Sequence, residues 1–325
     1  MISSAYLPEG SLIDTDENRE YLSSLEGLER AMNEGRILEA AAIRCSGTLT
    51  LTVSLGEYCG TIERDEAALT APGEAVKDIA VITRVGKPVC FKVMRIERPS
   101  LGGVQIILSR RAAQRECAEN FLSALTPGDI IPAKVTHLEH FGAFMDIGCG
   151  IVSLLSIDCI SVSRITHPRD RLTVGSELDV VVKSVEHDAD GKAGRIFVSR
   201  KELLGTWEEN ASLFAVGQTV TGIVRSVEAY GVFVELTPNL AGLAEYRGDV
   251  SVGQTAAVYI KNIIPERMKV KLVIIDAYRG IGGTTARALR GGFDSVPADT
   301  NHIDCWRYSP DCCERVVETQ FANNM

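Results

Sequence analysis

The sequence predicts an all-β protein built from repeated small barrels or sandwiches. Two segments match without gaps, "GDIIPAKVTHLEHFGAFMDI" from Gly128 and "GQTVTGIVRSVEAYGVFVEL" from Gly217. In both, apolar residues alternate with polar ones, which is typical of strands with one buried face. Each segment continues into further strand-like runs that are separated by short turns. Because many short strands follow one another in this way, a barrel or sandwich is favoured.

A fainter copy precedes these two. It starts at Gly35, and its "LSRR" at 108–111 corresponds to "VSRK" at 198–201. The aromatic residues of the later copies are missing, because "CSGTLTL" stands where "EHFGAFM" would be. The predicted domains are a degenerate repeat over 35–113, a complete repeat over 128–201 and a shortened repeat over 217–278.

The segments between and around the repeats predict short helices. Residues 1–34 are acidic, and apolar residues at helical spacing over 14–35 predict one amphipathic helix that packs on the first repeat. Residues 202–216 predict a helical connector with Trp207 as its anchor. Residues 279–325 are expected to form a glycine-rich linker and a tail with a helix that docks through Trp306 and Phe321.

Composition limits the classes of function. The net charge of −9 argues against a protein that coats nucleic acid through bulk positive charge, although residues 1–34 alone hold eight acidic and two basic residues. The nine cysteines form no Cys-x-x-Cys pair, which suits a reducing compartment. Neither a signal peptide nor a membrane span is recognisable, so a soluble, cytoplasmic protein without membrane contact is expected.

Within 128–201, the stretches "EHFGAFMDIG", "GIVSL", "SRITHPRDRLTVGSELDVVV" and "GRIFVSRKELLGTW" resemble the RNA-binding repeat of the bacterial ribosomal protein S-one family. The resemblance is strong over 128–277 and weak over 35–111. It implies three tandem five-stranded OB-type barrels whose open faces bind oligonucleotides. It also implies binding without turnover, and no catalytic constellation is recognisable in the sequence.

The resemblance also implies binding residues. In the second repeat the two aromatic residues that stack on RNA bases fall at Phe141 and Phe144, and the family's histidine falls at Ser153. The residues that flank the last strand fall at Asp188 and Arg195. The candidates for phosphate contacts in this repeat are basic residues and one histidine: Lys134, Arg164, His167, Arg169 and Lys183.

The third repeat supplies a poorer version of the same site. Its aromatic pair is Tyr230 and Phe233, with Arg225 nearby and Lys269 at the last strand. Glu245 stands at the histidine position, and a carboxylate is unfavourable beside a phosphate path. We therefore expect weaker RNA contact here, or a role in protein docking.

Some of these candidate binding residues could instead have a purely structural role. Phe141 and Phe144 could both be core residues if a bulge at Gly142 changes the face of the strand. His167, which precedes Pro168, could serve only to shape a turn. The tail holds His302, Cys305, Cys312 and Cys313, but their spacing matches no standard zinc finger, so no metal or cofactor is predicted.

The favoured function is binding of single-stranded mRNA, in translation at the small ribosomal subunit. Two alternatives are a protein-interaction scaffold, suggested by the net charge and by the first repeat, and an accessory factor in RNA processing or decay. Neither is enzymatic.

Overall fold

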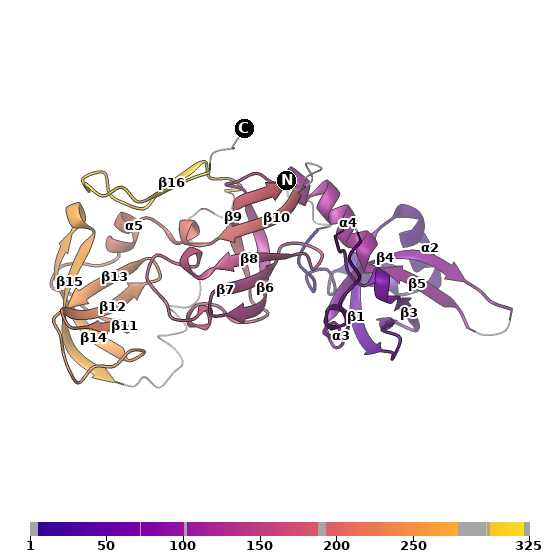
Figure 1. Cartoon of the computed structure of the whole chain (residues 1–325), viewed down its shortest axis with the longest axis horizontal. Helices are drawn as coiled ribbons and strands as arrows, with labels where there is room; N and C mark the ends of the chain where they lie inside the picture. Colours follow the sequence, from indigo (N-terminus) through magenta and orange to yellow (C-terminus); the bar gives the residue numbers. More distant parts are fainter. Residues whose placement is uncertain are drawn as a thin grey trace.

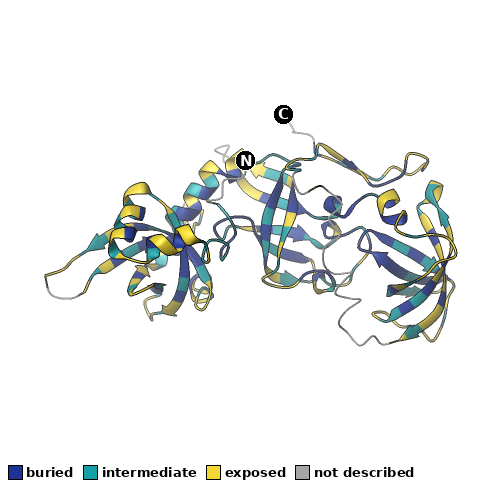
Figure 2. Ribbon diagram, turned by 180° about the vertical axis from the view of Figure 1, so that it is seen from behind, coloured by how far each residue is buried: buried dark blue, intermediate teal, exposed yellow. Residues whose placement is uncertain are grey.

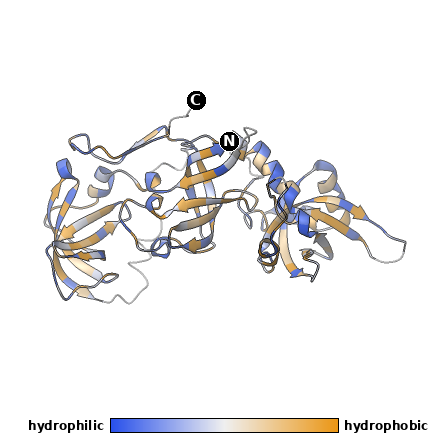
Figure 3. Ribbon diagram, viewed as in Figure 1, coloured by the Kyte–Doolittle hydropathy of each residue, from blue (hydrophilic) through white to orange (hydrophobic). Residues whose placement is uncertain are grey.

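The computed structural model describes residues 6–71, 73–100, 103–187, 193–278, 297 and 300–321. The described part of the chain contains three closed five-stranded barrels, which follow one another along an elongated molecule (Figure 1). The predicted fold class is therefore confirmed. Buried residues, dark blue in Figure 2, and hydrophobic residues, orange in Figure 3, lie along the strands of each barrel.

The three barrels share one topology. In each, the third strand pairs in parallel with the fifth, and the other neighbours are antiparallel. Barrel 1 has β1 (Ile37–Cys45), β2 (Leu51–Leu55), β3 (Tyr58–Ile62), β4 (Pro88–Glu97) and β5 (Gln105–Ser109). Barrel 2 has β6 (Ile130–Glu139), β7 (Gly142–Asp146), β8 (Val152–Ser156), β9 (Glu177–His187) and β10 (Ala193–Ser199). Barrel 3 has β11 (Thr219–Glu228), β12 (Gly231–Thr237), β13 (Leu240–Ala244), β14 (Thr255–Ile264) and β15 (Lys269–Tyr278).

Short helices flank the barrels. The α-helices are α1 (Asp16–Leu22), α2 (Leu25–Glu34), α3 (Asp78–Ile82), α4 (Arg110–Asn120) and α5 (Trp207–Ala211). Single 3₁₀ turns span Arg64–Glu66, Leu122–Ala124, Ile157–Cys159, Pro168–Asp170, Lys201–Leu204 and Pro265–Arg267. The connector between barrels 2 and 3 contains α5, and Trp207 is buried there in the same core as barrel 3.

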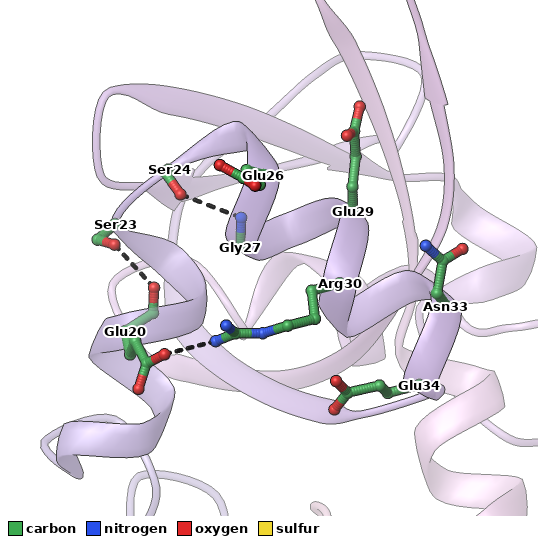
Figure 4. A pocket seen from close by; sticks show the side chains of 9 residues that line it. All are labelled: Glu20, Ser23, Ser24, Glu26, Gly27, Glu29, Arg30, Asn33 and Glu34. Atoms are coloured by element: carbon green, nitrogen blue, oxygen red, sulfur yellow. Dashed lines mark hydrogen bonds and ion pairs between the residues drawn. The ribbon is translucent and has the colours of Figure 1, made fainter.

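The expectation of one helix over 14–35 is wrong, because the segment forms two helices. Ser24 is extended and caps α2 by accepting a hydrogen bond from the Gly27 amide (Figure 4). A Cβ at Gly27 would lie 2.5 Å from the carbonyl oxygen of Tyr21, so the tight approach of the two helices requires glycine. Helix α2 buries Leu28 and Ala31 against the core of barrel 1.

The outer side of these two helices is an acidic hollow. Its lining includes Glu20, Glu26, Glu29 and Glu34 (Figure 4). Arg30 offsets part of this charge, since its Nη2 atom lies 2.6 Å from Oε1 of Glu20. Acidic side chains of residues 1–34 thus lie on the outer surface of the two helices that pack on barrel 1.

Helix α4 joins barrel 1 to barrel 2, and the sequence analysis did not predict it. Ser109, the last residue of β5, caps the helix by accepting a hydrogen bond from the Ala112 amide. Its buried side includes Ala113 and Cys117, which belong to the core of barrel 2. The helix buries these residues against barrel 2, and contacts between two domains leave no signal in the repeat pattern of the sequence.

The C-terminal tail is a two-stranded hairpin, so the predicted helix is wrong. Strands β16 (Cys305–Arg307) and β17 (Glu318–Gln320) are antiparallel, with Trp306 opposite Thr319. The β-branched residues in "RVVETQF" favour strand over helix. Trp306 and Phe321, the two residues through which the tail was expected to dock, are nevertheless buried in the core of barrel 3.

A buried ionic cluster holds barrels 1 and 2 together. Arg110 binds Glu9 through two contacts, Nε to Oε1 at 2.6 Å and Nη2 to Oε2 at 3.0 Å. Arg84 approaches Glu9 Oε2 at 3.2 Å. The Glu9 amide donates to Asp146 Oδ2 of barrel 2 at 2.8 Å. Burial opposes ionisation of Glu9, but the charge and hydrogen bonds of Arg110 overcome it and lower the pKa of Glu9.

Glu39 lies beside this cluster and forms no salt bridge with any of the residues that the structure describes. Its Oε2 accepts hydrogen bonds from the amides of Gly10, Leu12 and Ile13, whereas the buried Oε1 has no partner in the described ranges of the chain. Burial raises the pKa of Glu39 to about 7, and it raises the pKa of Asp146 to about 6. Both carboxyl groups therefore bind protons more tightly in the folded protein than in the unfolded chain.

We expect stability to fall as the pH rises from about 5 to about 8, because over this range the folded state must release protons that the unfolded chain has already lost. Glu39→Gln keeps the acceptor for the three amides and removes the titration. The variant should show a smaller loss of urea midpoint between the two pH values than the wild type. Equal losses would show that Glu39 does not titrate in this range.

Candidate nucleic-acid interface

Two phenylalanine rings stand on the outside of barrel 2, and we call this pair the aromatic platform. Phe141 lies in the turn between β6 and β7 and is 50% exposed, while Phe144 is half-buried on β7. Their centroids are 6.0 Å apart and the rings are perpendicular. His137 stacks on Phe144 at 6.3 Å, and His140 meets the edge of Phe141 at the same distance. The platform is thus the centre of a group of four rings.

The platform does not arise from a bulge at Gly142. Ala143 and Met145 fill the barrel interior, so Phe144 points outward by simple alternation, and Phe141 lies in the turn, outside that alternation. The register shift lies instead on β6, between Val135 and His137. A Cβ at Gly142 would lie 2.4 Å from the carbonyl oxygen of Leu155, so it is strand β8 that approaches this glycine.

Strand register extends the platform across the barrel. Phe144 pairs with Leu154 on β8, and Leu154 pairs with Phe197 on β10. All three side chains are half-buried on the outer face. Leu154 and Phe197 were not predicted from the sequence, since only the pairing of strands brings them beside Phe144. Together the three residues form an apolar surface on which a flat base could lie.

The family's histidine position was expected at Ser153, but this side chain points inward. Ser153 is 3% exposed and donates a hydrogen bond to the carbonyl oxygen of Ile196 at 2.7 Å. Leu154, one residue later, occupies the outward position. A shift of one residue in a strand moves a side chain to the opposite face, and pattern matching alone does not detect it.

Barrel 3 repeats the geometry with fewer apolar residues. Tyr230 is 69% exposed, and its ring centroid lies 6.1 Å from that of Phe233. Phe233 pairs with Leu243, which pairs with Lys271 in the place of Phe197. Lys269 and Glu245 are exposed near the ends of strands.

At the corresponding paired positions, the described strands of barrel 1 carry no aromatic residue. There Thr52 pairs with Thr61, which pairs with Ile107. The sequence-based view that the first repeat lacks a stacking surface therefore agrees with the register of its strands.

The predicted phosphate contacts lie in different settings. Arg164 and Arg195 are exposed, and Arg195 stands two residues before Phe197 on β10. Lys134 contacts the carbonyl oxygen of Glu9 at 3.2 Å and Glu177 at 3.1 Å, which places it at the junction with barrel 1. Lys183 lies 3.2 Å from the sulfur of Cys159. Asp188 lies outside the described residues.

His167 and Arg169 interact with each other. His167 Nδ1 accepts a hydrogen bond from the Arg169 amide and caps the 3₁₀ turn at Pro168–Asp170, so the histidine shapes this turn. The Arg169 guanidinium lies 3.2 Å from His167 Nε2 and remains exposed.

Arg225 of barrel 3 faces barrel 2. Its Nε lies 2.6 Å from Glu235 Oε2, and Arg171 of barrel 2 reaches the same oxygen at 2.5 Å. Arg225 Nη1 is also 3.6 Å from Asp170. This arginine therefore joins the two barrels, and its charge is paired with the carboxylates of Glu235 and Asp170.

Among the residues that the structure describes, no three His, Cys, Asp or Glu side chains gather as a metal site would require. No helix in that part of the chain is long and apolar enough to cross a membrane.

The fold and the outward aromatic pairs define a class of proteins, those with tandem OB-type barrels of the S1 type. Residues 125–201 match the family described as "S1 RNA binding domain". The chain belongs to the S1 family.

Its relatives include small ribosomal subunit protein bS1 of Staphylococcus haemolyticus, which is 30% identical over 249 residues, 74% of this chain and 57% of the relative. The bS1 protein of Leuconostoc lactis is 34% identical over 180 residues, 53% of this chain and 39% of the relative. The chain thus spans about half the length of the curated relatives it matches.

Among solved structures, a multidomain protein with nucleic acid binding domains from Streptococcus pneumoniae covers 74% of this chain, and 73% of that protein is covered. Its identity is 15% and its TM-score 0.22. GSP13 from Bacillus subtilis is 28% identical over 23% of this chain and 55% of its own, with a TM-score of 0.21.

Proposed function

We propose that this protein binds single-stranded RNA on the outer face of barrel 2 and releases it chemically unchanged. The observation that carries the proposal is the aromatic platform, in which Phe141 is half exposed and Phe144 continues into Leu154 and Phe197. Apolar rings on a surface are costly to leave in water, and they offer stacking faces that accept any base. The match of residues 125–201 to the S1 RNA binding domain supports the same function.

The three barrels differ in what they offer RNA. Barrel 2 combines the platform with the exposed Arg164, Arg169 and Arg195. Barrel 3 has the aromatic pair, but Arg225 is engaged by Glu235 and Glu245 is exposed. Barrel 1 carries Thr52, Thr61 and Ile107 at the positions where barrel 2 has Phe144, Leu154 and Phe197. Barrel 2 is therefore the main binding surface in this proposal, and barrel 3 is an auxiliary one.

The site of action that we propose is the small ribosomal subunit, where the protein would hold mRNA. Support comes from the relatives in Staphylococcus haemolyticus and Leuconostoc lactis, both of which are small ribosomal subunit proteins. The purified protein should co-sediment with small subunits and be released by brief RNase treatment. Sedimentation at the top of the gradient, with and without RNase, would argue against this location.

Binding to RNA should weaken as salt concentration rises. Each phosphate neutralised by an arginine or lysine releases counterions, so log K against log salt should have a slope of roughly −0.7 for each phosphate contacted on a single strand. Fluorescence anisotropy with labelled oligouridylate at several salt concentrations measures this slope. An affinity that does not depend on salt would exclude a role for the exposed arginines of barrel 2.

Barrel 1 favours a second candidate function, that of a protein-interaction scaffold. Its outer face presents threonines in place of aromatic rings, and α1 and α2 display the acidic hollow. This function does not exclude RNA binding by barrel 2. It would become the main function if the whole chain bound no RNA even at low salt.

A further inference from the structure

A groove of about 430 Å³ separates barrel 2 from the C-terminal hairpin. Barrel 2 contributes residues of the segment 157–165, among them Ile157 and Arg164, together with Lys201. The hairpin contributes Trp306, Val317 and Thr319. We call this space the hairpin groove. Its volume falls within the range of small-molecule binding sites, and the repeats by themselves would not form it.

The hairpin groove starts where the aromatic platform ends. The amide of Ile157, the first residue of the groove, donates a hydrogen bond to the carbonyl oxygen of Phe141 at 2.9 Å. Ser156, its neighbour, pairs with Gly142 between the two phenylalanines. When a base stacks on Phe141, the next nucleotide of the same RNA strand therefore lies beside the hairpin groove.

The cations of the groove are suited to a phosphate. Arg164 is exposed and forms no salt bridge among the described residues. Lys201 lines the same space, and its charge acts on Asp158 together with that of Lys183. Of the two carboxylates in the lining, Asp158 has a lowered pKa, chiefly through a hydrogen bond with Ser156 and to a lesser extent through the charges of Lys183 and Lys201. Glu318 accepts a hydrogen bond from Gln320 at 3.1 Å.

The far wall of the groove is suited to a base. Trp306 is 7% exposed, and its buried indole Nε1–H has no hydrogen-bond partner within the described part of the chain. A buried donor that lacks an acceptor costs roughly 1–3 kcal/mol. A base that packs against this wall brings its carbonyl and ring-nitrogen acceptors next to Trp306. Val162 and Ile165, both half-buried, add apolar surface.

We propose that the hairpin groove binds the nucleotide next to those stacked on the aromatic platform. Arg164 and Lys201 contact its phosphate, and its base lies against Trp306. The C-terminal hairpin is then one wall of the RNA site. This inference rests on the proposed function. It adds that the RNA-binding site extends from the outer face of barrel 2 into the hairpin groove.

The test compares labelled oligouridylates of about four and about eight nucleotides, lengths within the range of roughly 4–16 that one OB fold covers. The wild type should bind the longer oligonucleotide more tightly. Arg164→Ala should weaken binding of the longer one about fivefold and that of the shorter one less than twofold, because only the longer strand reaches the groove. Arg115→Ala, an exposed arginine on α4 outside the groove, is the matched control and should change neither.

A second measurement locates the RNA. The longer oligonucleotide carrying 4-thiouridine should cross-link within residues 301–321, and the cross-link should weaken in Arg164→Ala. Equal loss for both lengths in Arg164→Ala, or cross-links confined to the barrel face, would overturn the inference and leave RNA binding by the platform intact. Failure of every oligonucleotide to bind at low salt would instead overturn the proposed function.

Discussion

The double variant Phe141→Ala/Phe144→Ala is expected to bind single-stranded RNA at least tenfold more weakly than the wild type. Stacking of a base on an aromatic side chain contributes roughly 1–3 kcal/mol per base, and a loss of about 1.4 kcal/mol is a tenfold loss of affinity. Anisotropy titrations at one fixed salt concentration measure the effect. The salt slope should change little, because the arginines that contact phosphates remain.

The matched control for this variant is Tyr230→Ala/Phe233→Ala, which removes the equivalent pair from barrel 3. The two pairs have nearly the same ring geometry, 6.0 Å and 6.1 Å between centroids. We expect a smaller loss of affinity for the barrel 3 variant, since Lys271 takes the place of Phe197 there and Arg225 is held by Glu235. Thermal melting should confirm that both variants are folded. Wild-type affinity in the barrel 2 variant would refute the stacking mechanism.

Arg110→Ala should lower the free energy of unfolding by about 3–5 kcal/mol, the usual cost of removing one partner from a buried ion pair. Glu9 would remain in the junction between barrels 1 and 2 with Arg84 as its remaining cation. The variant also loses the hydrogen bond from Arg110 Nη1 to the carbonyl oxygen of Ala67 at 3.1 Å. Urea denaturation followed by circular dichroism measures the change.

Arg111→Ala is the control for this prediction. Arg111 is the next residue of α4 and pairs with Glu66, but both partners of that pair are partly exposed, so its loss should cost about 1 kcal/mol or less. The double variant Glu9→Gln/Arg110→Met should regain part of the lost stability, because it leaves no charge of this pair buried. If Arg110→Ala and Arg111→Ala lost stability equally, the junction would not depend on the Glu9 pair.

The repeats and their barrels could be predicted because both depend on local pattern. Strands of period two and matching segments at Gly128 and Gly217 are visible without any knowledge of contacts. The outward placement of Phe144 follows from the same alternation, once its neighbours Ala143 and Met145 are assigned to the core.

The rest of the site depends on pairings between distant residues. Leu154 and Phe197 join Phe144 only through strand register, and the inward direction of the Ser153 side chain likewise depends on how β8 pairs with its neighbours. The groove depends on Trp306, which comes from a tail far along the chain. Helix α4 was not predicted for a similar reason, because its Ala113 and Cys117 are buried only by contact with barrel 2.

Segments near both ends of the described chain, at Glu9 and at residues 301–303, form hydrogen bonds with barrel 2. These bonds affect the order in which the barrels fold during synthesis. The Glu9 amide can donate to Asp146 only after Asp146 has been synthesised. At the start of β6, the Ile130 amide donates to the carbonyl oxygen of Asn301, and the carbonyl oxygen of Gly128 accepts from the Ile303 amide, so both bonds need residues that are synthesised much later. Contacts between residues so far apart in sequence form slowly, and domains generally fold as they emerge. Barrel 2 should therefore reach its final stability only after residues 301–303 have been synthesised, long after its own last strand is complete. Amide hydrogen exchange on nascent chains stalled before residue 300 should find β6 less protected than the strands of barrel 1.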